Sequence, residues 1–282
     1  MMKRIEEVAG AVTAVTGFEK GSGKTTFLNL ALTHARSRGP AAIFTIGVDG
    51  GLKAREGGPS GEIRVEPGDV VMTTEAFARA SDARFEVLEA VPGRTALGRL
   101  LLGRAMRPGA VTLVGAEHFS TLARMIARVR EEGWAASVLV DGAVNRITQV
   151  SALGEIQFAF TVRVDPGNLA RAASRIRALD ALAGLPEGGE GLQLEGPVTA
   201  ETLKALPEGI TAWTAEDFTK FFLEPQDLLR TLERYQVAVR RRFQLLCVAT
   251  TLRGVSPAAF LQAVGPRAAS RILFNPFEVV PC

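Results

Sequence analysis

The feature that most constrains this 282-residue chain is a glycine-rich run at 17–26, which reads GFEKGSGKTT. An apolar, β-branched run at 10–16 precedes it, and apolar residues at helical spacing follow it over 25–38. Glycines let backbone N–H groups converge on one point without Cβ clashes. The first turn of a helix adds unpaired N–H donors and the positive end of its dipole. We call residues 17–26 the glycine loop, and its place between strand and helix predicts phosphate binding.

Two side chains of the glycine loop have expected roles. Lys24 brings a full positive charge to the β- and γ-phosphates, and Thr25 offers a hydroxyl to Mg²⁺. The alternative is a Gly/Ser-rich turn whose lysine is an ordinary surface residue; the strand and helix around the loop favour phosphate binding. The expected nucleotide-binding residues are Gly17, Glu19, Lys20, Gly21, Ser22, Gly23, Lys24, Thr25 and Thr26.

A phosphate loop of this kind needs a carboxylate near its metal, and three acidic residues follow apolar runs. Asp141 follows the run at 137–140, Asp49 follows the run at 41–48, and Glu117 follows the run at 111–116. The alternative for each is a capping carboxylate at a strand-to-helix junction. The expected catalytic residues are Lys24, Asp141 and Asp49. The expected metal ligands are Thr25, Asp49, Asp141 and Glu117.

Short β-rich runs alternate with helical periods over the whole length. We therefore expect an α/β fold with a doubly wound, mostly parallel sheet and helices on both faces, as in P-loop NTPases. We expect one domain over 1–282, with a loop or sub-boundary near 184–191. Strands are expected at 10–16, 41–48, 70–73, 85–91, 111–116, 136–140, 158–164, 192–195, 210–213, 243–250 and 271–274. Helices are expected at 25–38, 95–106, 118–132, 169–182, 227–240 and 257–264, and residues 93–95 would open the second of them.

Composition narrows the function classes. No apolar run approaches the roughly 18–20 residues that cross a bilayer, so we expect no membrane partner. The two cysteines, Cys247 and Cys282, form no CxxC pattern, which argues against zinc and disulfide scaffolds and fits a cytoplasmic protein. The net charge is only +3 and the chain has one Tyr and two Trp, so nucleic-acid binding is not expected.

The spacing of the glycine loop, Gly17-x5-Gly23-Lys24-Thr25, resembles that of dethiobiotin synthetase. This enzyme belongs to the branch of P-loop proteins that includes the partition ATPases. Lys20 resembles the signature lysine of those ATPases, but it precedes Lys24 by four residues where their pattern has five. Asp141-Gly142-Ala143 resembles an acidic-Gly-Ala segment of dethiobiotin synthetase, with Asp in place of Glu.

A fainter resemblance involves GRTALG at 93–98 and VLVDGAVNR at 138–146. These segments and the late strand–helix alternation are similar to the ATPase subunit of reactivating factors for lysine 5,6-aminomutase. That resemblance implies a nucleotide-driven protein that acts on a partner protein, and a homodimer is compatible with it. It also accounts for a phosphate loop without a recognisable site for a second substrate.

Three functions remain open. In the first, Mg²⁺-dependent ATP binding and slow hydrolysis drive a switch or chaperone-like reactivase, with the Gly/Pro-rich segment 53–68 and the segment 184–191 as candidate moving parts. In the second, the chain is an ATP-dependent ligase or kinase of the dethiobiotin synthetase type. In the third, it is a nucleotide-binding scaffold. ATP is favoured over GTP because the sequence has no Asn-Lys-x-Asp motif.

Overall fold

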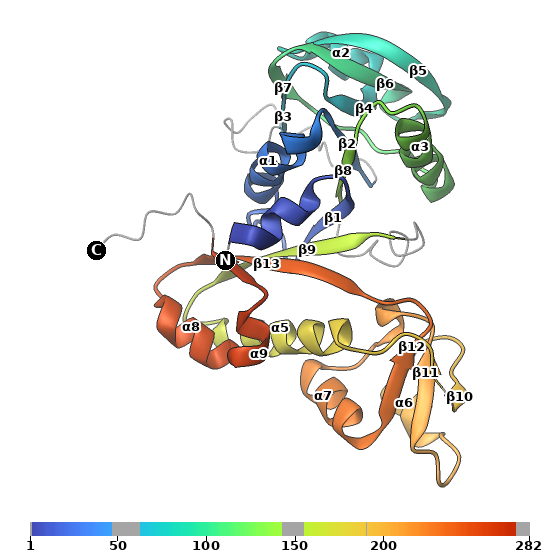
Figure 1. The fold of residues 1–282 in the computed structure, drawn as a ribbon, viewed down its shortest axis with the longest axis vertical. Helices are drawn as coiled ribbons and strands as arrows, with labels where there is room; N and C mark the ends of the chain where they lie inside the picture. The colour runs from blue at the N-terminus through green and yellow to red at the C-terminus, as the bar shows by residue number, and fades with distance from the viewer. Residues whose placement is uncertain (1, 47–62, 143–154, 190, 275–282) are drawn as a thin grey trace. The chain divides into compact units, whose positions relative to one another are not determined.

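The computed structural model describes residues 2–46, 63–142, 155–189 and 191–274. The chain divides into two compact units, Met1–Thr161 and Val162–Cys282, which we call unit 1 and unit 2 (Figure 1). The division falls within a strand, β9 (Gln157–Val164), whereas the sequence marked 184–191 as the place for a sub-boundary. That one domain spans 1–282 stays a prediction.

Unit 1 alternates strands with helices around the glycine loop. Its elements, besides the first part of β9, are η1 (Met2–Val8), β1 (Val12–Gly17), α1 (Lys24–Ala35), η2 (Arg36–Arg38), β2 (Ala41–Thr45), β3 (Ile63–Val65), β4 (Val70–Thr74), α2 (Glu75–Ala80), β5 (Arg84–Thr95), β6 (Gly98–Arg107), β7 (Gly109–Val111), α3 (Phe119–Glu131) and β8 (Ser137–Asp141).

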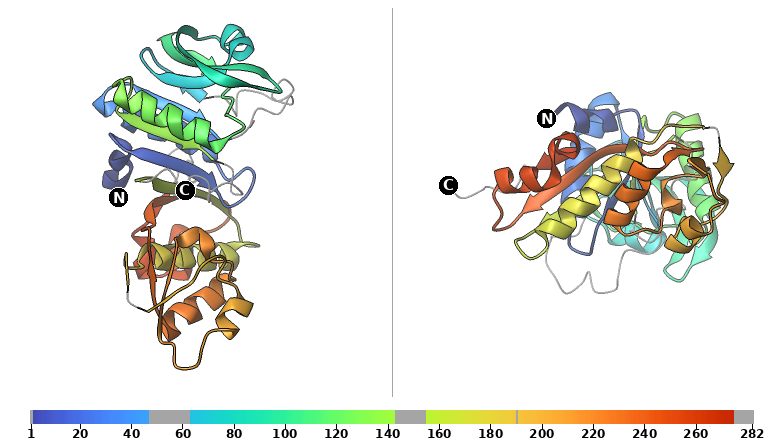
Figure 2. Two further views of the ribbon diagram at one scale, coloured as in Figure 1. Left: turned by 90° about the vertical axis from the view of Figure 1, so that its right-hand side faces the viewer. Right: turned by 90° about the horizontal axis from the view of Figure 1, so that it is seen from below.

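The large sheet of unit 1 is mixed and mostly parallel. Its strands lie in the order β9-β1-β8-β2-β4-β6-β5. The first five are parallel to their neighbours, and β6 and β5 add an antiparallel hairpin at one edge. In Figures 1 and 2, α1 and α3 lie on opposite sides of β2 and β8. The predicted α/β class with a mostly parallel sheet is thereby confirmed.

Helix α1 packs on the sheet through residues that recur at helical spacing. Phe27, Leu28, Ala31 and Leu32 are buried, and the hydroxyl of Ser137 on β8 donates to the carbonyl oxygen of Ala35 at 2.9 Å. Ser137 and Asp141 lie four residues apart on one strand, so their side chains share a face of the sheet. The face that carries Asp141 is therefore the face that α1 covers.

Two helix and strand predictions in unit 1 are wrong. Residues 95–106 are not helical, because they form the end of β5, a tight turn and most of β6. Their apolar run 100–102 fits a buried strand as well as a helix, and only pairing with β4 and β5 decides between them. Residues 93–95 belong to β5, so they open no helix. Residues 112–116 form no strand, although Val114 N donates to Met72 O at 3.3 Å.

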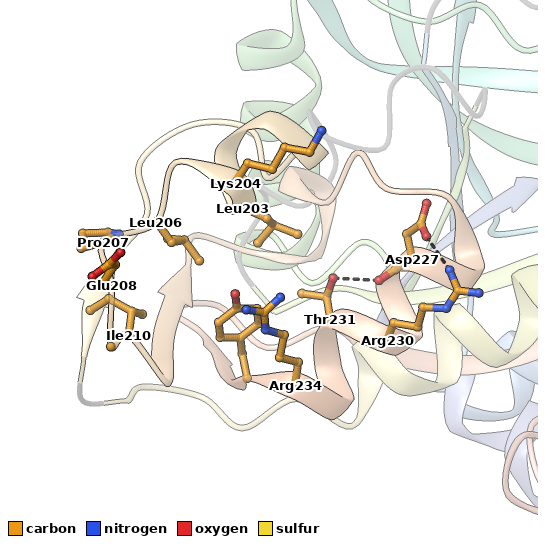
Figure 3. A pocket seen from close by; sticks show the side chains of 12 residues that line it. Leu203, Lys204, Leu206, Pro207, Glu208, Ile210, Asp227, Arg230, Thr231 and Arg234 are labelled. Carbon is orange, nitrogen blue, oxygen red and sulfur yellow. Dashed lines mark hydrogen bonds and ion pairs between the residues drawn. The ribbon is translucent and has the colours of Figure 1, made fainter.

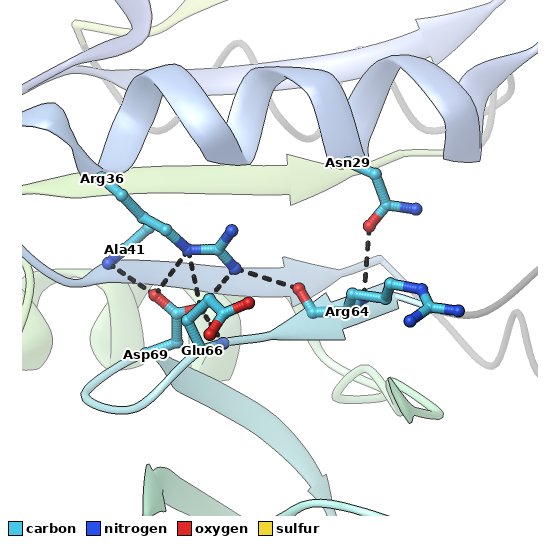
Figure 4. A network of polar contacts seen from close by, with 6 residues as sticks. All are labelled: Asn29, Arg36, Ala41, Arg64, Glu66 and Asp69. Atoms are coloured by element: carbon cyan, nitrogen blue, oxygen red, sulfur yellow. Dashed lines mark hydrogen bonds and ion pairs between the residues drawn. The ribbon is translucent and has the colours of Figure 1, made fainter. Parts of the chain in front are cut away.

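A buried carboxylate fixes the turn between β3 and β4. Asp69 is 1% exposed and accepts hydrogen bonds from Arg36 Nε at 3.0 Å, Ala41 N at 3.1 Å and Glu66 N at 2.8 Å (Figure 4). The turn itself runs from Glu66 through Pro67 and Gly68, whose φ is 95°. Pro followed by Gly at positive φ is the signature of a type II turn. Residues 63–68 of the predicted moving segment are therefore fixed by strand pairing and by Asp69, and residues 53–62 lie outside the described residues.

Unit 2 begins in β9 and continues the alternation. Its further elements are α5 (Leu169–Ala183), β10 (Leu192–Gln193), α6 (Ala200–Lys204), β11 (Ala212–Ala215), η5 (Phe218–Lys220), α7 (Pro225–Arg234), β12 (Gln236–Val239), β13 (Gln244–Leu252), α8 (Pro257–Val264), α9 (Pro266–Ala269) and β14 (Ile272–Phe274). Within it, β10, β11 and β12 form a parallel sheet, and β14 pairs in parallel with β13.

The predicted helix at 227–240 is too long. It ends at Arg234, because residues 236–239 pair with β11 as β12. The glycine-rich segment 184–191 is tied to that strand where it is described, since Gly188 N donates to Val239 O at 2.8 Å. No described helix in either unit is long and apolar enough to cross a membrane.

Candidate functional site

The glycine loop leaves β1 by folding tightly over its last residue. A Cβ atom at Gly17 would lie 2.1 Å from Ser22 Oγ, so only glycine fits at this position. Gly21 and Gly23 have φ angles of 78° and 90°, which side chains other than glycine rarely adopt. The three predicted glycines are therefore required for different reasons, the first by close approach and the other two by backbone conformation.

The loop is anchored to the neighbouring strand β9. Ser22 Oγ lies 2.7 Å from Thr161 Oγ1, and Phe18 N donates to Thr161 O at 3.0 Å. The ring of Phe18 also meets the ring of Phe160 edge to face, with centroids 5.8 Å apart. Ser22 and Thr161 are both buried. These contacts tie the glycine loop to the sheet.

Helix α1 begins directly after the loop. Gly23 occupies the N-cap position and supplies no side-chain cap, and the first N–H groups of any helix have no partner within it. Thr25 is partly buried and Thr26 is exposed, as are Glu19 and Lys20 earlier in the loop. The start of α1 thus combines an uncapped N-terminus, the positive end of a helix dipole and a lysine at the first helical position.

The structure brings Lys24 and Asp141 together. Lys24 Nζ lies 2.9 Å from Asp141 Oδ1, and their side chains are 21% and 15% exposed. Asp141 ends β8, which pairs directly with β1, the strand that leads into the loop. Two predicted residues that are 117 positions apart (141 − 24) therefore meet at the carboxyl edge of the parallel strands, where open α/β sheets bind ligands.

A third residue at this edge, Thr45, carries no signal in the sequence. Asp141 is the register partner of Val15 on one side and of Thr45, the last residue of β2, on the other. Thr45 is 1% exposed, and its Oγ1 has no hydrogen-bond partner among the described residues. Only its position four residues before Asp49 could have drawn attention to it, and threonine is common in strands without any functional role.

Two predicted carboxylates remain, Asp49 and Glu117. Asp49 lies outside the described residues. Glu117 is exposed and follows a segment that is not a strand, so the physical reason for predicting it, the end of a buried strand, is removed. In the described parts of the chain, no group of three or more His, Cys, Asp or Glu side chains is placed to hold a metal ion.

The oxygen groups at the edge suit Mg²⁺ better than most other metals. Mg²⁺ prefers oxygen ligands, keeps several waters and is commonly bound through one or two carboxylates together with phosphate oxygens. Asp141, Thr25 and the buried hydroxyl of Thr45 are donors of this class. The residues present therefore fit Mg²⁺ that arrives with a phosphate ligand.

Unit 2 has a separate surface pocket of about 540 Å³ between the end of α6, the turn at 206–210 and α7 (Figure 3). Asp227 accepts from Arg230 Nη1 at 3.3 Å, and the guanidinium of Arg234 lies 5.1 Å from the ring centre of Tyr235. None of these residues stands out in the sequence, since their spacing is that of any amphipathic helix. The charged groups of the pocket are paired with one another or exposed.

Comparisons of the chain with protein-family models, with curated proteins and with solved structures found no match.

Proposed function

We propose that unit 1 binds the phosphates of a magnesium nucleotide, ATP in preference to GTP, in the manner of a P-loop NTPase. The observation that carries the proposal is the ion pair of Lys24 with Asp141 beside a glycine loop that ends in an uncapped helix. A lysine on a flexible stem can exchange a carboxylate for a phosphate, because both offer negatively charged oxygens. A turn with an ordinary surface lysine would not hold that lysine against a largely buried carboxylate.

Each residue then has a defined task when nucleotide binds. The N–H groups of the loop and of the first turn of α1 donate to phosphate oxygens. Lys24 moves from Asp141 to the phosphates, which frees Asp141 to accept hydrogen bonds from metal-bound water, and Thr25 offers its hydroxyl to the metal. Mg²⁺ supplies charge neutralisation at the phosphate oxygens.

The same arrangement supports slow hydrolysis that a partner protein accelerates. Among the described residues, the loop brings a lysine and a carboxylate together, Lys24 and Asp141. His34 lies in the last turn of α1, and ten residues of helix at about 1.5 Å each separate it from Lys24. We therefore propose a cytoplasmic switch or chaperone-like reactivase, in which a partner protein supplies a group that helps to activate the attacking water.

Thermal unfolding with and without MgATP tests nucleotide binding. Ligand at 100 times its Kd stabilises the wild type by about 2.7 kcal/mol, and we expect Lys24→Ala to remove this stabilisation while the unliganded protein melts almost as before. Lys204→Ala, at an exposed lysine of unit 2, is the matched control and should keep the full shift. An equal shift in wild type and Lys24→Ala would refute the proposal.

Steady-state turnover separates the three functions. The switch predicts slow ATP hydrolysis by the purified protein and faster hydrolysis with its partner. Fast turnover that depends on a small carboxylic or amino acid would instead establish the ligase or kinase. ATP binding without any hydrolysis would establish the scaffold.

A further inference from the structure

We propose that Thr45 is a positioning residue of the nucleotide site, whose hydroxyl holds a water molecule of the Mg²⁺ hydration shell beside Asp141. The inference rests on the proposed function and extends it to a residue outside the glycine loop. It follows from three properties of Thr45: its position in the sheet, its burial, and a hydroxyl group that has no hydrogen-bond partner among the described residues.

The sheet register places Thr45 next to Asp141. The two residues are partners across β2 and β8, and partners in parallel strands project their side chains from the same face. That face is the one covered by α1, because Ser137 on it contacts Ala35 and Asp141 on it contacts Lys24. The hydroxyl of Thr45 therefore lies on the side of the sheet from which the start of α1 reaches Asp141.

The backbone holds these two positions rigidly together. Ile46 N donates to Asp141 O at 2.9 Å, and Gly142 N donates to Val15 O at 2.9 Å, so the sheet continues one residue beyond the site. A Cβ atom at Gly142 would be 3.5 Å from Ile46 Cδ1, within ordinary contact distance. Thr45 is thus fixed by a continuous ladder and is not a mobile end residue.

The hydroxyl of Thr45 is buried without a partner among the described residues. A buried hydroxyl that makes no hydrogen bond loses its hydration without compensation, and valine, with the same shape, would avoid that loss. Ordered water that bonds to otherwise unsatisfied buried groups is a common resolution of such a deficit. Thr45 can both donate to and accept from that water.

The coordination chemistry of Mg²⁺ indicates that the water bound by Thr45 belongs to the hydration shell of the ion. Mg²⁺ gives up its waters reluctantly, and proteins hold them through carboxylates and hydroxyls around the ion. Asp141 supplies the carboxylate, and Thr45 is its neighbour in the same row of the sheet. Partners that orient metal-bound groups in this way change metal affinity by 10–100-fold when they are removed.

Thr16 provides an internal control of the same kind. It lies in β1, one residue before the glycine loop, and its buried Oγ1 also has no partner among the described residues. Its register partner, however, is Phe160, whereas Asp141 is the partner of Val15, so Thr16 projects from the opposite face. We therefore expect an unpaired hydroxyl at this end of the strands to hold a Mg²⁺-bound water only if it lies on the face of the sheet that α1 covers.

The test compares nucleotide affinity with excess Mg²⁺ and with EDTA, by calorimetric titration of ATP into the full-length protein. In the wild type, Mg²⁺ should tighten ATP binding. In Thr45→Val the Mg²⁺-dependent tightening should fall by roughly 10-fold, while the Kd in EDTA stays unchanged. Thr45→Ser, which restores a hydroxyl, should recover most of the effect, and Thr16→Val should behave as the wild type.

The outcomes distinguish this inference from the proposed function. If the wild type binds no nucleotide under either condition, both fail together. If the wild type binds MgATP and Thr45→Val binds it equally well, Thr45 has no positioning role and the proposed function stands. If Thr45→Val weakens binding equally with Mg²⁺ and with EDTA, or if Thr45→Ser fails to restore the Mg²⁺ effect, the hydroxyl is structural and the inference is overturned.

Discussion

Two aspartates of unit 1 occupy contrasting surroundings. Asp69 is 1% exposed, and main-chain N–H groups of Ala41 and Glu66 together with Arg36 surround its carboxylate. Asp141 is 15% exposed and faces the long side chain of Lys24. Both aspartates lie at the end of a strand, and each forms an ion pair with a basic side chain.

The difference lies in what can move. The donors to Asp69 include backbone groups that belong to the sheet and the turn, so that carboxylate cannot change partners without local unfolding. The ammonium of Lys24 that faces Asp141 lies on a four-carbon stem, which can rotate to another anion at little cost. A carboxylate surrounded by fixed donors stabilises the fold, whereas one paired with a flexible cation at an open sheet edge is available for ligand chemistry.

The largest effect that this comparison predicts is on folding, at Asp69. Asp69→Asn replaces a charged acceptor with a group that turns an N–H toward donors, so the free energy of unfolding should fall by about 3 kcal/mol. Urea unfolding of the full-length protein measures it. Asp82→Asn, at an exposed aspartate of the same unit, is the matched control and should change stability by less than about 0.5 kcal/mol. If Asp69→Asn lowered the free energy of unfolding no more than Asp82→Asn does, Asp69 would not have the structural role that separates it from Asp141.

Asp217 in unit 2 extends the comparison with a measurable pH dependence. Burial raises its pKa, but hydrogen bonds from Thr219 and Arg241 outweigh burial, so its pKa is lowered overall. A lowered folded pKa gives stability that is complete above the unfolded pKa of about 3.9 and is lost as the pH falls through the folded pKa. Asp217→Asn should therefore destabilise the protein by about 2 kcal/mol near pH 7.

The pH profile makes this prediction specific. The difference between wild type and Asp217→Asn should stay constant above about pH 5 and shrink toward zero as the pH falls below about 4. Urea unfolding at a series of pH values measures it. A difference that grows on acidification would mean that the folded pKa of Asp217 is raised and would contradict the assignment.

The smallest effect on folding is expected at Asp141 itself. In the unliganded protein Asp141→Asn should cost under about 1 kcal/mol, because Lys24 can turn its ammonium toward water. The Mg²⁺-dependent part of ATP binding should nevertheless be lost in this variant. If Asp141→Asn instead destabilised the fold as strongly as Asp69→Asn, the two aspartates would belong to one structural class.

Local patterns in the sequence predicted most of the parallel framework. Strands β1, β8 and β9 are short apolar runs and helices α1, α3 and α5 carry apolar residues at helical spacing, so each could be placed without knowledge of its neighbours. The β5–β6 hairpin could not, because its leucine run fits either structure until β4 pairs with it. The apparent helix at 227–240 failed for the same reason, since its last residues gain more from pairing with β11.

The residues of the candidate site likewise fall into those that a local sequence pattern predicts and those that it does not. The glycines, Lys24 and Asp141 carry local signals, namely a glycine spacing and an acid after a buried strand. Thr45 carries none, because its importance comes from the register that sets it beside Asp141. Glu117 shows the opposite case, in which a local signal, an acid after an apolar run, led to a residue that the tertiary structure leaves exposed.

The hydrogen bond between Ser22 and Thr161 has a consequence for the timing of synthesis. The two hydroxyls are separated by 139 positions, so the partner that fixes the glycine loop is translated long after the loop itself. At about 5–20 residues per second, a ribosome needs roughly 7 to 28 seconds to cover that distance. Until β9 emerges, the growing chain carries the complete glycine motif without the strand that shapes it. Under the proposed function, nucleotide binding to a loop shaped by Thr161 has to wait until the chain has been made past that residue.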